Sequence, residues 1–64
     1  MVIKECKFSS VIRVIEYDPI RMELFVETKD GRRYPYYNVP TEEAQAFMDA
    51  PSKGKYWNEF RRNR

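Results

Sequence analysis

The clearest hydrophobic pattern lies in the middle of the chain, between Met22 and Thr28. Apolar and other side chains alternate strictly there, which is the two-residue period of a strand with one buried face. We expect a half-buried antiparallel strand that points three side chains inward, Met22, Leu24 and Val26, and three outward, Glu23, Phe25 and Glu27.

A preceding strand is predicted at residues 9–17, because the segment SSVIRVIEY is rich in β-branched residues. Regular alternation would divide its apolar side chains between two faces. One face would carry Val11, Ile15 and Tyr17, and the other would carry Ile12 and Val14.

Turn residues separate the predicted strands. Asp18-Pro19 favours a reversal, since Asp can bond its own backbone and Pro presets φ. Asp30-Gly31 is a strong hairpin signal, because glycine accepts positive φ. A third strand follows at residues 33–38, where Pro35 lacks a donor for the ladder and therefore predicts an edge or a bulge.

The pattern then changes to a helical period. Thr41 is a favourable N-cap residue for a first helix that extends to about Ala50, and Pro51 ends it. Ser52 can cap a second helix. Three aromatic residues would share one side of that helix, Tyr56, Trp57 and Phe60.

This order of elements predicts an α+β fold, with a small antiparallel β-meander followed by two C-terminal helices packed on one face. The meander has three strands, or four if residues 2–6 form another. Residues 1–64 are expected to form a single domain, because a chain this short supports one core at most.

Composition narrows the function classes. The chain has no His and a lone Cys6, so neither an internal disulfide nor a zinc cage is expected, and we predict no metal, cofactor or small-molecule substrate. General acid-base catalysis near neutral pH also lacks its usual residue, which argues against an enzyme. No apolar run is long enough to span a bilayer, and we expect a protein of the reducing cytoplasm with no membrane contact.

The net charge is only +2, but the cations gather at the end of the chain. From Ser52 onward a single acid, Glu59, accompanies five cations, Lys53, Lys55, Arg61, Arg62 and Arg64. Such a segment can contact a phosphate backbone. The alternative is a solvated helix face that ends in a basic tail.

Within this segment, Ser52-Lys53-Gly54-Lys55 stands at the predicted start of a helix. Backbone N–H groups, a hydroxyl and two ammonium groups could receive one anion there. The alternative is that Ser52 only caps the helix, while Gly54 allows the two helices to pack closely.

The aromatic residues also have two interpretations. Tyr34 and Tyr36 share one side of a predicted strand and, with Trp57, could stack on unpaired bases. In a domain of this size, such rings more often pack into the core. Phe25, which lies between two glutamates, is the better candidate for an exposed ring and suggests a protein contact.

Together these segments resemble the KTSC domain. The resemblance rests on Tyr34-Pro35-Tyr36 followed by Val39-Pro40, and on the segment APSKGKYWN at residues 50–58. It extends from about Phe8 to Arg62. The family's tyrosine pair maps onto Tyr34 and Tyr36, and its Ser-x-Gly element maps onto Ser52 and Gly54. Trp57 stands where a Phe is more usual.

The KTSC family occurs at the carboxyl end of some lysyl-tRNA synthetases and as small free-standing proteins of bacteria and phages. The resemblance therefore implies a small accessory module that contacts RNA, tRNA-like or other. The candidate contact residues are Ser52, Lys53, Gly54, Lys55, Arg61, Arg62, Tyr34, Tyr36 and Trp57. The alternative is a protein-interaction or homodimerisation module that uses the edge strand with Pro35, or the face with Phe25.

Overall fold

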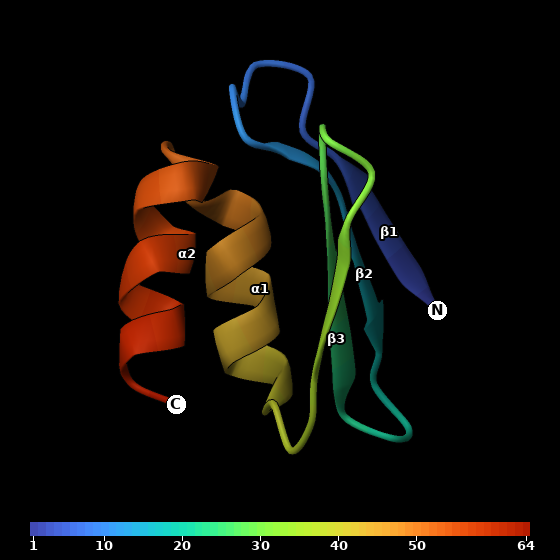
Figure 1. The fold of residues 1–64 in the computed structure, drawn as a ribbon. Helices are drawn as coiled ribbons and strands as arrows, with labels where there is room; N and C mark the ends of the chain where they lie inside the picture. The colour runs from blue at the N-terminus through green and yellow to red at the C-terminus, as the bar shows by residue number, and fades with distance from the viewer.

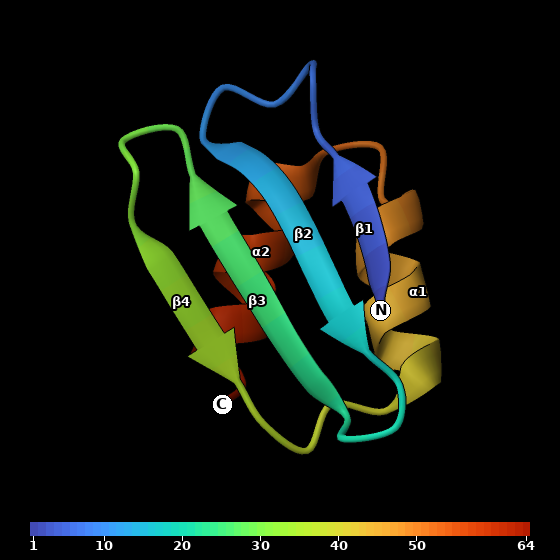
Figure 2. The same ribbon diagram turned by 90° about the vertical axis from the view of Figure 1, so that its right-hand side faces the viewer.

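A single antiparallel sheet and two helices form two layers, and the computed structural model describes all 64 residues (Figure 1). The elements are β1 (Val2–Glu5), β2 (Ile12–Asp18), β3 (Glu23–Thr28), β4 (Arg33–Tyr36), α1 (Thr41–Asp49) and α2 (Lys53–Arg62). The sheet order is β1-β2-β3-β4, and both helices cover the same face (Figure 2). The predicted α+β meander with two C-terminal helices is therefore confirmed, and β1 is its fourth strand.

The core lies between the sheet and the helices. Its fully buried side chains come from both layers, with Leu24 and Val26 on β3 and Phe47 on α1. Trp57 and Phe60 on α2 close the core from the helix side. The alternation of β3 is confirmed, because Leu24 and Val26 are buried while Glu23, Phe25 and Glu27 are only half-buried.

The predicted faces of β2 are partly wrong. Ile12 is fully buried beside Ile15 and Tyr17, whereas Val11 precedes the strand and is 45% exposed. The register between β2 and β3 shifts by one residue between Ile12 and Val14, which is a β-bulge. The extra residue reverses the alternation, so Ile12 points into the core in place of Val11.

The turns form at the predicted dipeptides. One Asp18 carboxylate oxygen accepts hydrogen bonds from the backbone N–H groups of Ile20 and Arg21. Gly31 has a φ of 91°, as the hairpin prediction requires. Met22 was expected in the strand but has a φ of 54° and ends the turn, so β3 begins at Glu23.

The two helices begin differently. Ser52 is the N-cap of α2, as predicted, and its hydroxyl accepts a hydrogen bond from the Lys55 N–H. The prediction that Thr41 caps α1 is wrong, because Pro40 is the N-cap and no side chain caps that end. Thr41 is instead the first helical residue. Neither helix has the length and apolar character that crossing a bilayer requires.

Candidate functional site

Three connections meet at one end of the molecule, at the top of Figures 1 and 2: the β1–β2 loop, the β3–β4 hairpin and the start of α2. Two grooves lie there. The loop groove, of about 430 Å³, lies between residues 4–10 and residues 51–54. The hairpin groove, of about 700 Å³, lies between α2 and the β3–β4 hairpin. Ser10, Ser52 and Gly54 line both grooves, so the two meet at the first turn of α2.

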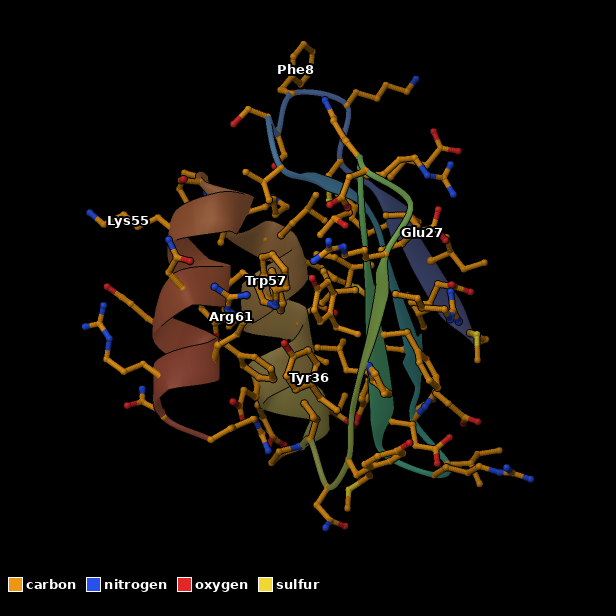
Figure 3. All side chains as sticks on the ribbon, in the orientation of Figure 1. Phe8, Glu27, Tyr36, Lys55, Trp57 and Arg61 are labelled. Carbon is orange, nitrogen blue, oxygen red and sulfur yellow. The ribbon has the colours of Figure 1, made fainter.

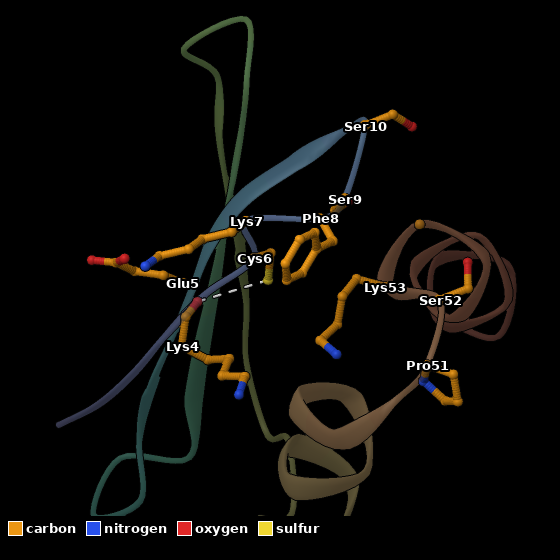
Figure 4. Close-up of a pocket in the computed structure, with 11 residues that line it drawn as sticks. Lys4, Glu5, Cys6, Lys7, Phe8, Ser9, Ser10, Pro51, Ser52 and Lys53 are labelled. Carbon is orange, nitrogen blue, oxygen red and sulfur yellow. Dashed lines mark hydrogen bonds between the residues drawn. The ribbon is translucent and has the colours of Figure 1, made fainter.

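The β1–β2 loop is shaped by Ser9. Its hydroxyl accepts hydrogen bonds from the backbone N–H groups of Val11 and Ile12, at 3.3 and 3.0 Å. This turn leaves Phe8 at the tip of the loop, where its side chain is fully exposed (Figure 3). Phe8 therefore has no role in the core. It lies on the rim of the loop groove (Figure 4).

Cys6 lies in the wall of the loop groove, but it is buried. Burial raises the pKa of its thiol above the usual value, and the nearby ammonium groups of Lys53 and Lys4 offset this only in part. A raised pKa keeps the sulfur protonated at neutral pH. The Cys6 thiol is therefore unsuited to act as a nucleophile.

The first turn of α2 brings together the predicted anion-binding residues. The Lys53 ammonium group donates a hydrogen bond to the Ala50 carbonyl and so caps the end of α1. Lys55 is exposed and points outward from α2 (Figure 3). A Cβ at Gly54 would meet no atom within 4 Å, so Gly54 is not needed for close helix packing. This result contradicts the packing interpretation of that glycine.

The floor of the hairpin groove is aromatic. Tyr34 and Trp57 contact each other edge to face, with ring centroids 5.2 Å apart. The Arg61 guanidinium lies 4.3 Å from the centroid of the Trp57 ring, which is a cation–π contact (Figure 3). Trp57 is only 4% exposed, so a base cannot stack on it without displacing Arg61. The expectation of an open stacking ring at Trp57 is therefore wrong.

Tyr36 and Arg62 do not join the two grooves. The Tyr36 ring is half-buried against Phe60, with centroids 5.0 Å apart, and its hydroxyl accepts a hydrogen bond from the Trp57 indole. The Tyr36 ring thus packs against the protein's own aromatic residues. The expectation that it stacks on a base is wrong. Arg62 is exposed in the last turn of α2, outside both grooves.

One carboxylate belongs to the hairpin groove, that of Asp30. Its hydrogen bond from the Thr28 hydroxyl lowers its pKa, and Arg32 contributes in the same direction. Asp30 is therefore negatively charged at neutral pH and holds the hairpin together. Its negative charge limits how close an anion can come on that side of the groove.

The charges that line the two grooves are mostly positive. Five cations line them, Lys4, Lys7 and Lys53 in the loop groove and Lys55 and Arg61 in the hairpin groove. Only two acids do so, Glu5 and Asp30. None of the five cations forms a salt bridge within the chain. Arg64, by contrast, is paired with Glu43 near the opposite end.

Sequence reasoning missed the contribution of β1 and of the β1–β2 loop, namely Lys4 on the strand and Lys7 and Phe8 in the loop. These residues belong to no periodic pattern, and their place beside α2 depends on the tertiary fold. One signal was present, since Phe8 is an aromatic residue outside any alternating segment, between Lys7 and Ser9-Ser10. The candidate protein contact at Phe25 is weakened, because that ring is half-buried under the Arg33 guanidinium at 4.6 Å.

Known proteins are similar to this chain in sequence, and one solved structure is similar to it in fold. A protein of Stutzerimonas stutzeri is 41% identical over 51 residues, which cover 80% of this chain and 72% of that protein. A lysine–tRNA ligase of Nostoc sp. is 35% identical over 51 residues, which are only 9% of the ligase. The crystal structure of a KTSC domain protein from Yersinia pestis superposes with a TM-score of 0.78 and 33% identity, covering 89% of this chain and 82% of that one.

The family comparison agrees with the structural match. The KTSC domain family matches residues 8–64, so the matched part begins at Phe8 and leaves β1 outside it. It includes both helices and three of the four strands. The chain therefore belongs to the KTSC domain family.

Proposed function

We propose that this protein binds single-stranded RNA across the end of the molecule where the loop groove and the hairpin groove meet. The observation that carries the proposal is the excess of unpaired cations along these connected grooves, with fully exposed Phe8 on the rim. Positive grooves that follow a phosphate backbone, together with aromatic rings for the bases, are the usual composition of single-strand binding sites.

Each group has a distinct part in this proposal. Lys55 and Arg61 contact phosphates in the hairpin groove, and Lys7 does so in the loop groove. Phe8 stacks on a base, since it has no partner within the chain. Gly54 leaves space for the sugar-phosphate backbone to approach the first turn of α2. This replaces the stacking role first expected of Tyr36 and Trp57.

Two further points support RNA as the ligand and binding as the activity. A related segment occurs in a protein named lysine–tRNA ligase, so a similar domain is joined to a protein named for tRNA. The structure brings no three metal-ligating side chains together, and its one thiol is buried and protonated. These features favour a binding module over a catalytic one.

The experiment measures the anisotropy of a labelled, short single-stranded RNA at low salt, with wild type and with Phe8→Ser. Loss of one stacked base is worth roughly 1–3 kcal/mol, so we expect about 5- to 150-fold weaker binding by Phe8→Ser. The matched control is Ile20→Ser, which removes a similarly exposed apolar side chain from the β2–β3 turn. That turn lies at the opposite end of the molecule (Figure 2).

Ile20→Ser should bind as wild type does. If the Phe8→Ser and Ile20→Ser variants bind the RNA with equal affinity, Phe8 does not stack on a base. Absence of RNA binding by folded wild-type protein at low salt would overturn the proposed function itself.

A further inference from the structure

The two edges of the sheet differ in how they are protected. An open edge presents unpaired backbone N–H and C=O groups and can pair with another strand. β4 forms one edge and β1 forms the other (Figure 2). The backbone groups that each edge strand turns outward follow from its hydrogen-bond pattern.

At the β4 edge, proline blocks further pairing. The Thr28 N–H donates to the Arg32 carbonyl at 2.9 Å, which makes these two residues a hydrogen-bonded pair. Bonded and non-bonded pairs alternate along an antiparallel ladder, so Tyr34 and Tyr36 also bond to β3 and Pro35 faces outward. Pro35 has no N–H to offer there. Pro35 therefore makes this edge a poorer surface for strand pairing, which counts against the interaction role first considered for it.

The β1 edge has no such protection. The Cys6 N–H donates to the Arg13 carbonyl at 3.0 Å, and by the same alternation Lys4 and Val2 bond to β2. The backbone groups of Ile3 and Glu5 therefore point away from the sheet. All four β1 residues are exposed, and the Ile3 side chain is 60% exposed. Apolar side chains and free backbone groups thus occur on the same edge.

We propose that this open edge pairs, antiparallel and about a two-fold axis, with β1 of a second copy of the chain. Four symmetric registers use the outward backbone groups, centred on Val2, Ile3, Lys4 or Glu5. Centring on Val2 pairs only residues 1–3 of each chain and so makes the fewest backbone hydrogen bonds. Centring on Lys4 or on Glu5 sets like charges directly opposite each other, which is unfavourable. Centring on Ile3 sets Ile3 opposite Ile3 and Val2 opposite Lys4. The Ile3-centred register is therefore the longest overlap that avoids a like-charge pair.

This dimer has a defined shape. A two-fold axis perpendicular to the sheet joins the two four-stranded sheets into one and keeps both helix layers on the same side. A contact between two short strands is small, so the dimer should be weak and depend on concentration. The pairing uses the backbone of β1 and not the two grooves, so it stands apart from the proposed RNA binding.

The first test follows molar mass against concentration by sedimentation. Wild type should rise from the monomer mass of 7.8 kDa toward twice that value. Ile3→Pro removes an outward N–H without removing a bond to β2, and it should stay monomeric. Ile20→Ser is the control for lost apolar surface and should behave as wild type does. A monomer at every concentration, or a dimer that persists in Ile3→Pro, overturns the proposal.

Cysteine crosslinking tests the same pairing without a proline in the strand. In a Cys6→Ala background, Ile3→Cys places two thiols opposite each other in a bonded pair, about 5.5 Å apart between Cα atoms, which a disulfide can span. Mild oxidation should therefore give a covalent dimer. Val2→Cys in the same background lies opposite Lys4 and should remain uncrosslinked. Equal crosslinking of the two variants, or none in either, overturns the proposed register.

Discussion

The indole N–H of Trp57 donates a hydrogen bond to the Tyr36 hydroxyl at 3.0 Å, and this contact joins α2 to the edge strand β4. The indole is buried, so its N–H has little access to water. The pair lies beside the hairpin groove, of which Trp57 forms part of the floor. A hydrogen bond between two aromatic residues thus holds one wall of the candidate site against the other.

Removing the Tyr36 hydroxyl, which accepts this hydrogen bond, should lower the stability of the fold. We expect Tyr36→Phe to lower the free energy of unfolding by about 1–3 kcal/mol, because the buried indole N–H loses its partner. Tyr37→Phe is the matched control, since the exposed Tyr37 hydroxyl has no hydrogen bond in the chain and its loss should cost under about 0.5 kcal/mol. Urea unfolding followed by Trp57 fluorescence measures both. Equal values for the two variants would contradict the role given to this bond.

The two helix starts should respond differently to alanine. Ser52→Ala removes the side-chain cap of α2, and we expect a loss of about 1 kcal/mol in unfolding free energy. Thr41→Ala removes no cap. It takes away only a long 3.4 Å contact with the Tyr17 hydroxyl, which still donates to the Val39 carbonyl, so stability should change by less than about 0.5 kcal/mol. Thermal or urea unfolding decides between them. A larger effect at Thr41 than at Ser52 would show that the caps are assigned wrongly.

Alanine substitutions at the two glycines should change the free energy of unfolding in opposite directions. Gly54→Ala meets no neighbour and improves helix propensity, so stability should rise by up to about 1 kcal/mol. Gly31→Ala forces alanine into a positive φ and should destabilise by about 1 kcal/mol or more. If RNA approaches the first turn of α2 closely, Gly54→Ala should bind more weakly while folding better. Unchanged RNA affinity would show that the ligand does not come near Gly54.

The raised pKa of the Cys6 thiol predicts a pH dependence. Below the unfolded-state pKa of about 8.5 both states are protonated, and the contribution of the thiol to stability is complete. Above that value the unfolded thiol ionises first, so the contribution is lost as pH rises toward the folded-state pKa. Cys6→Ser lacks this thiol titration. Between about pH 8 and about pH 10, the free energy of unfolding should therefore fall more steeply for wild type than for Cys6→Ser. A constant difference would show that the folded-state pKa is not raised.

Salt dependence tests the contacts assigned to phosphates. Each lysine or arginine that contacts a phosphate of a single strand contributes about 0.7 to the slope of log affinity against log salt. Lys55→Ala should therefore reduce the slope by about that amount. Arg64→Ala is the control, because Arg64 is engaged with Glu43 away from the grooves. An unchanged slope in Lys55→Ala would show that Lys55 does not contact a phosphate.

Local features were readable from the sequence. The alternation of β3, the turns at Asp18 and Gly31, and the cap at Ser52 each depend on residues close together in the chain, and the structure has all of them. These features depend on backbone geometry and nearby hydrogen bonds, which short segments specify by themselves. The sequence therefore determined the order of elements and the α+β class.

The surface at the groove end was decided by the tertiary structure. The bulge before Val14 depends on how β2 pairs with β3, so alternation alone placed Ile12 on the wrong face. Arg61 lies one helical turn from Trp57 on α2, but the covering of Trp57 also depends on Tyr34, which belongs to the distant strand β4. Phe8 joins the site only because the β1–β2 loop packs near the start of α2. Such contacts between distant segments form on folding, because burial of the shared core brings them together.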